Sequence, residues 1–67
     1  MQMYRIYGRD KGSKQRFKPL GSQGGDLCFV VNLIYALNWD DKDIVEAKCK
    51  ELNDMNETLE FEVRKVK

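Results

Sequence analysis

Apolar and polar residues alternate strictly along Thr58–Arg64, which is the clearest pattern in the chain. A period of two is that of a β-strand with one face on the core and the other in water. The segment therefore predicts a strand with three apolar side chains inward and three charged ones outward, fraying at residues 65–67. The inward set is Leu59, Phe61 and Val63, and the outward set is Glu60, Glu62 and Arg64.

The segment before this strand has the period of an amphipathic helix. Asp40 is expected to be its N-cap, because a carboxylate there accepts from the free amides of the first turn. Trp39 and Ile44, on either side of that cap, then form a hydrophobic staple. Asn56 is expected to end the helix in a left-handed conformation. The predicted buried stripe is Ile44, Val45, Cys49, Leu52 and Met55.

The N-terminal part of the chain predicts a hairpin. Met1–Tyr7 contains aromatic and β-branched residues, which suit a strand. Residues 8–13 include two glycines and an aspartate, a composition typical of a turn. Gln15–Leu20 returns as a second strand. Pro19 has no amide hydrogen to donate, so this second strand is short or lies at an edge of the sheet.

The middle of the chain predicts a loop followed by a core strand. Gly21–Asp26 has three glycines in six residues, without the Gly-Lys-Ser/Thr sequence of a phosphate-binding loop. Leu27–Leu37 is almost continuously apolar, which favours a central strand buried on much of both faces. Asn32 interrupts this run. It marks either a bulge in one strand or a bend between two short strands.

The predicted order of elements is therefore β-β-β-α-β, in a single α+β domain over residues 1–67. One helix packed on a small three- or four-stranded sheet buries the apolar faces of both. With 67 residues the domain is close to the lower size at which a hydrophobic core suffices.

Composition narrows the class of protein. The chain is 42% hydrophobic and 34% charged, a balance typical of a soluble globular domain. Cys28 and Cys49 are either reduced, buried thiols of a cytoplasmic protein or one disulfide between strand and helix. Two cysteines without a histidine do not make a zinc site, and we expect no metal and no cofactor. The apolar run Leu27–Trp39 is too short to span a bilayer, so no membrane association is expected.

The residue types argue against an enzyme. The chain has no histidine, the commonest general base. Both thiols are expected in the core, where a thiol is inert. Asp40, Asp41 and Asp43 are explained by the cap and dipole of the helix, and they lack the spacing of a calcium loop. We therefore expect no catalytic residues.

Charge is unevenly distributed along the chain. Residues 1–26 carry six basic and two acidic residues, whereas residues 27–67 carry six basic and nine acidic ones. Basic and aromatic side chains together attract phosphates and stack on unpaired bases. The alternative is a solvated hairpin tip whose lysines protect an edge strand. The candidate binding surface is Arg5, Arg9, Lys11, Lys14, Arg16, Phe17 and Lys18, with Arg5, Arg16 and Lys18 expected on one face.

The other candidate activity is the binding of another protein. The edge near Phe17–Leu20, the loop at residues 21–26 and the acidic helix surface all offer contacts. An acidic face can cover the basic nucleic-acid-binding site of a partner. An exposed edge strand also allows self-association.

Four short segments form a recurring pattern: Tyr4–Asp10, Arg16–Leu20, Asn32–Ala36 and Phe61–Lys65. This pattern resembles that of a group of small, mostly uncharacterised bacterial proteins carried on phages and conjugative elements. The resemblance spans most of the chain and brings no activity or site residues with it. It implies a cytoplasmic protein with an accessory or inhibitory role, such as blocking a host defence nuclease.

Two functional hypotheses follow. The first is a non-enzymatic protein-binding accessory module of a phage or mobile element that inhibits a host defence protein. The alternative is a weak nucleic-acid-binding protein that uses the basic N-terminal hairpin. Affinity for phosphates falls steeply with salt, which separates the second hypothesis from the first.

Overall fold

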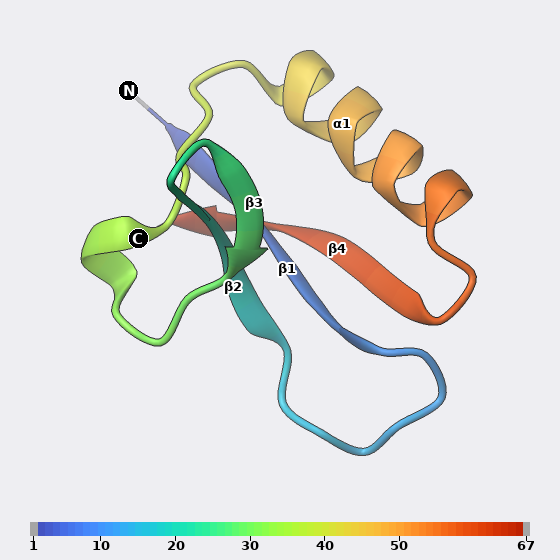
Figure 1. Cartoon of the computed structure of the whole chain (residues 1–67). Helices are drawn as coiled ribbons and strands as arrows, with labels where there is room; N and C mark the ends of the chain where they lie inside the picture. The colour runs from blue at the N-terminus through green and yellow to red at the C-terminus, as the bar shows by residue number, and fades with distance from the viewer. Residues whose placement is uncertain (1, 67) are drawn as a thin grey trace.

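The computed structural model describes residues 2–66, which form a four-stranded antiparallel sheet with one helix packed on it (Figure 1). This confirms the predicted α+β class and the order β-β-β-α-β. A short 3₁₀ helix, η1, lies between the third strand and the α-helix. The elements are β1 (Met3–Asp10), β2 (Lys18–Gln23), β3 (Asp26–Phe29), η1 (Leu33–Tyr35), α1 (Lys42–Met55) and β4 (Leu59–Val66).

The sheet has the strand order β3-β2-β1-β4. β1 and β4 pair along their whole length, from Met3 opposite Val66 to Asp10 opposite Leu59. This long pairing carries β1 past its predicted end and holds Lys65 and Val66 in β4, where fraying was expected. The predicted strand residue Met1 and the predicted frayed residue Lys67 lie outside the described residues. β1 and β2 pair only at Tyr7 opposite Pro19 and Gly8 opposite Lys18.

Residues 36–39 fill the space where β1 and β2 diverge. The Leu37 amide donates to the Leu20 carbonyl at 3.0 Å. Trp39 and Tyr4 exchange two backbone hydrogen bonds, of 2.9 and 2.7 Å. Gly21 is bridged to Ala36, and a Cβ atom at Gly21 would lie 2.4 Å from the Tyr35 carbonyl oxygen. The divergence turns the β2–β3 hairpin away from β1 and brings η1 to the side of the sheet (Figure 1).

In the middle of the chain, the loop and the core strand were both predicted to be longer than they are. Residues 21–23 belong to β2, and the turn is confined to Gly24 and Gly25, which have φ values of 61° and 88°. β3 is a four-residue edge strand, so most of Leu27–Leu37 lies outside the sheet. Asn32 lies in a bend, which is one of the two expected alternatives, and it is also the N-cap of η1. The segment after η1 forms isolated bridges at Ala36 and Trp39 instead of a second short strand.

The helix lies where its pattern predicts, shifted at its start by one residue. Asp41, rather than Asp40, is the N-cap, and its Oδ1 accepts from the amides of Asp43 and Ile44 at 2.9 and 3.2 Å. Ile44 is consequently 58% exposed and makes no staple with Trp39. No helix in residues 2–66 has the length and apolar character needed to cross a membrane.

The C-terminal end of the helix also differs from expectation. Asn56 has φ −122° and ψ 108°, which is an extended conformation and not a left-handed one. Its side-chain amide donates to the Leu52 carbonyl at 2.8 Å, so the side chain closes the helix instead of the backbone. Met55, predicted on the buried stripe, is exposed.

The core lies between α1 and the face of β1 and β4 that it covers. Ile6 and Val45 are fully buried, and Leu20 and Cys49 complete the cluster. Phe61 and Val63 pack against this cluster, which confirms the predicted inward face of the last strand. Both cysteines are free thiols, Cys49 buried and Cys28 half-buried.

Gly8 has a specific role in this packing. The Phe29 and Phe61 rings stack with their centroids 6.1 Å apart. A Cβ atom at Gly8 would lie 2.7 Å from Phe61 and 2.9 Å from Phe29. The absence of a side chain at this position of β1 therefore lets aromatic rings from the two edge strands meet.

Candidate functional site

Large apolar side chains face solvent around η1, in residues 31–35, which we call the apolar segment. Val31 is 102% exposed, Ile34 78%, Tyr35 56% and Leu33 49%. All four were predicted to lie in the core. A contiguous exposed group of this kind on a small domain is typical of an interaction surface.

Hydrogen bonds fix the shape of the apolar segment. The Asn32 side chain accepts from the Ile34 amide at 3.0 Å, and the Asn32 carbonyl accepts from the Tyr35 amide at 3.0 Å. Val30 and Ala36, on either side, are buried. The segment is thus a turn that is anchored at both ends by buried residues. Its large side chains project from the outside of the turn into solvent.

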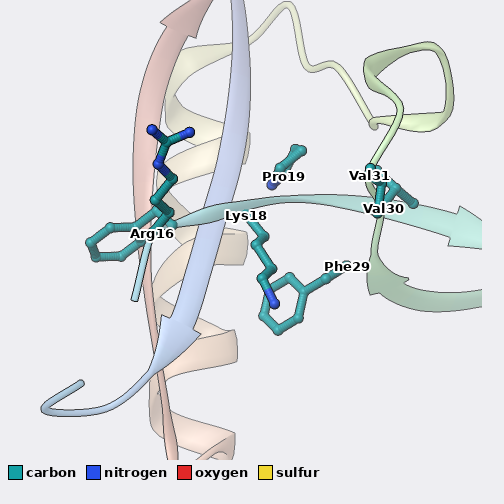
Figure 2. Close-up of a pocket in the computed structure, with 7 residues that line it drawn as sticks. Arg16, Lys18, Pro19, Phe29, Val30 and Val31 are labelled. Atoms are coloured by element: carbon teal, nitrogen blue, oxygen red, sulfur yellow. The ribbon is translucent and has the colours of Figure 1, made fainter. Parts of the chain in front are cut away.

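A groove lies next to the apolar segment, between β2 and the end of β3 (Figure 2). It has a volume of about 360 Å³, and Val31 belongs both to its lining and to the apolar segment. Figure 2 shows the Arg16 guanidinium and the Lys18 ammonium pointing in opposite directions from this part of the chain. The lining residues are Arg16, Phe17, Lys18, Pro19, Phe29, Val30 and Val31.

The predicted basic surface is divided between different parts of the molecule. Lys18 lies opposite Gly8, on the sheet face that α1 covers, whereas Arg5 lies on the other face. The expectation that Arg5, Arg16 and Lys18 share one face is therefore wrong. Strand alternation separates them, because β2 begins only at Lys18 and its register with β1 sets the side to which each residue points.

Phe17 is held between two arginines on the open face of the sheet. The Arg9 guanidinium lies 4.2 Å from the centre of the Phe17 ring, and that of Arg64 lies 5.2 Å from it. Arg9 also pairs with Glu60, and Arg64 pairs with Glu62. Both arginines are therefore engaged by groups of this chain, and they cover part of the Phe17 ring on which a base would have to stack.

The other predicted basic residues are spread along the β1–β2 connection. Lys11 lies in the turn, where its amide donates to the Thr58 carbonyl at 2.9 Å. Lys14 is exposed further along the connection. Arg5 donates from Nε to Oδ1 of Asn38 at 2.8 Å, which ties β1 to the segment that precedes α1.

The thiol of Cys49 lies in the core, beneath α1. Burial raises the pKa of the Cys49 thiol, and the negative charge of Glu62 raises it further. A thiol with a raised pKa is a poor nucleophile, because the reactive species is the thiolate. Within residues 2–66, no three Cys, Asp or Glu side chains come together as a metal site would require.

The sequence indicated part of this site and missed the rest. Arg16, Phe17 and Lys18, three of the predicted surface residues, line the groove. The apolar segment was missed because its residue types are those of a core. Asn32 was the available signal, since an asparagine that caps a turn interrupts the strand pairing that burial would require.

Comparison of the chain with protein-family models, curated proteins and solved structures found no match.

Proposed function

We propose that this chain is a non-enzymatic protein-binding module whose contact surface is the apolar segment. The observation that carries the proposal is the exposure of Val31, Leu33, Ile34 and Tyr35 within five residues. Burying a large apolar side chain in an interface is favourable by about 1.5–3 kcal/mol. Four such side chains on an anchored turn provide the compact apolar centre that binding surfaces use.

Preorganisation of the turn supports the same proposal. The backbone of residues 32–36 is held by the Asn32 cap and by the bond from the Ala36 amide to the Leu33 carbonyl, at 3.1 Å. A partner therefore meets side chains on a turn that is already formed, and less conformational entropy is lost on binding.

The biological role is proposed from the resemblance described above. The resemblance supports an accessory protein of a phage or mobile element that acts in the cytoplasm. Such a protein would inhibit a host protein by covering its active or binding site. A host defence nuclease is the first class of target to test.

The alternative is weak nucleic-acid binding by the basic hairpin. The contacts of Phe17 with Arg9 and Arg64 count against it, because a base would have to displace guanidinium groups from the ring. Arg9 and Arg64 also have carboxylate partners, which reduces the charge that they offer to phosphates.

Affinity capture from a nuclease-treated bacterial lysate tests the proposal, with Ile34→Asp as the variant and Ile44→Asp as its matched control. Both isoleucines are exposed, but only Ile34 lies in the apolar segment. We expect the wild-type chain and the Ile44 variant to retain the same protein, and the Ile34 variant to lose it. Equal capture by all three, or recovery of nucleic acid alone from untreated lysate, would contradict the proposal.

A further inference from the structure

We propose that a second copy of this chain adds to the sheet along the outer edge of β3, in a dimer with two-fold symmetry. The inference goes beyond the proposed function, because it uses residues 27–29 and not the apolar segment. Three features lead to it: the free backbone groups of β3, the register in which two copies of the strand match, and an apolar cavity beside them.

The outer edge of β3 carries unpaired backbone groups. β3 is the last strand of the sheet, and no strand within residues 2–66 pairs with its outer side (Figure 1). In an antiparallel pair, every second residue directs its amide and carbonyl to the neighbouring strand. The bond from the Val30 amide to the Pro19 carbonyl, at 3.0 Å, makes Val30 such a residue, and Cys28 is the next. Leu27 and Phe29 therefore direct their amides and carbonyls outward.

The opposite edge of the sheet is protected. On β4, the Asn53 side chain of α1 bonds to both the amide and the carbonyl of Phe61. Such protection is common in proteins, because an unpaired strand edge is a template for pairing with another chain. Among residues 2–66, no side chain bonds in this way to the backbone of Leu27 or Phe29. β3 is thus the edge at which a second copy adds.

The free groups of two copies match each other in one register. When Leu27 lies opposite Phe29 of the second copy, two-fold symmetry repeats the pair, and each pair exchanges two backbone hydrogen bonds. Cys28 then lies opposite Cys28 of the second copy, with the two Cα atoms about 4.5 Å apart. Asp26 is the charged residue of β3, and it lies opposite Val30 of the second copy. No like charges meet in this register.

An apolar cavity of about 370 Å³ lies beside the same edge. Leu27 and Phe29 line one side of it, Leu52 and Leu59 line another, and none of its lining residues is charged. Phe29 stacks with Phe61, so Leu27 and Phe29 project from the face of the sheet that α1 covers. Leu27 is 45% exposed. In the dimer, Leu27 of each copy lies next to Phe29 of the other and covers the open side of its cavity, which removes apolar surface from water.

Cysteine cross-linking tests the register. Diamide oxidises two thiols to a disulfide and takes up their two hydrogens, and the bond requires Cα atoms about 4.4–6.8 Å apart. We expect the wild-type chain to form a covalent dimer about tenfold faster than a variant with Cys28→Ser and Asp26→Cys, at equal concentration. Residue 26 lies opposite residue 30 of the second copy, too far from residue 26 for a disulfide. Asp26 is exposed and Cys28 half-buried, so random collision predicts the opposite order. Equal or faster cross-linking at position 26 would overturn the inference.

Sedimentation of a proline variant tests the edge itself. Leu27→Pro removes an amide that points outward and leaves the bonds between β2 and β3 in place. We expect the mean mass of the wild-type chain to rise with concentration and that of the variant to stay at the monomer. Equal behaviour of the two would overturn the inference, and the cross-linking comparison decides it even if the proline variant does not fold.

Ile34→Asp separates this inference from the proposed function. The variant should dimerise as the wild-type chain does, whether or not it loses protein capture. Loss of the dimer in this variant would assign self-association to the apolar segment and overturn the pairing of β3. Retained protein capture by the variant would overturn the proposed function alone.

Discussion

The side-chain amide of Asn53 on α1 pairs with the backbone of Phe61 on β4, as a neighbouring strand would. Its Oδ1 accepts from the Phe61 amide at 2.8 Å, and its Nδ2 donates to the Phe61 carbonyl at 3.1 Å. β4 is an edge strand of the sheet. One helical side chain thus satisfies two backbone groups at the edge and blocks strand addition there.

Asn53→Ala should lower the free energy of unfolding by about 1–2 kcal/mol, because it removes two hydrogen bonds. It should also increase self-association, because Phe61 becomes available to a second chain. Asp54→Ala is the matched control at the next helical position. Denaturant unfolding and sedimentation at two protein concentrations measure the effects. A monomeric Asn53 variant of unchanged stability would show that the pairing does not protect the edge.

Gly8→Ala should lower the free energy of unfolding by about 1–3 kcal/mol, as overpacking of a core does. The added methyl group would lie 2.7 Å from Phe61. The variant should also move the ring signals of Phe29 and Phe61 in NMR spectra. Gly12→Ala is the contrast, because Gly12 has no neighbour within 4 Å and its φ of 76° makes the cost purely one of backbone strain. Unmoved ring signals in the Gly8 variant would contradict the packing.

Ile6→Ala and Ile34→Ala should differ sharply in stability. Ile6 is fully buried, so its truncation should cost about 2–5 kcal/mol. Ile34 faces solvent, so its truncation should change the free energy of unfolding by less than about 0.5 kcal/mol. Urea denaturation of the two variants measures both values. Similar losses in the two would place residue 34 in the core and remove the basis of the apolar segment.

Cys49 should make stability fall at alkaline pH. The folded state raises the pKa of this thiol, so it holds the proton more tightly than the unfolded chain does. The resulting stabilisation is complete below the ordinary pKa of 9.0 and is lost as pH rises through the folded-state pKa. Cys49→Ala should remove this alkaline decline, whereas Cys28→Ala should preserve it. A decline of equal slope in all three proteins would contradict the assignment.

Local patterns predicted α1 and β4 because both have regular periods and one clear apolar face. The predicted N-cap was wrong by one residue because Asp40 and Asp41 both have a carboxylate that can cap a helix. With the helix beginning at Lys42, Ile44 is its third residue and points to solvent instead of packing against Trp39. These differences are small because the information needed lies within a few residues.

The apolar run at residues 27–37 shows where local patterns fail. Its course depends on backbone hydrogen bonds to residues far away in the sequence, such as those between Leu37 and Leu20 and between Trp39 and Tyr4. These bonds place residues 36–39 between β1 and β2 instead of in one continuous strand with residues 27–35. No local period encodes these bonds. Residue types identify an apolar surface without stating whether the chain itself covers it. The groove was partly predicted through Arg16 and Lys18, because their charge alone marks them as exposed.

The central claim is that residues 31–35 contact a partner protein, and site-specific photocrosslinking in the native host cell tests it most directly. A benzoyl-phenylalanine at position 34 is compared with one at position 44, which is similarly exposed on the helix. We predict one discrete crosslinked protein from position 34 and none from position 44. The same crosslinks from both positions, or none from position 34, would contradict the claim.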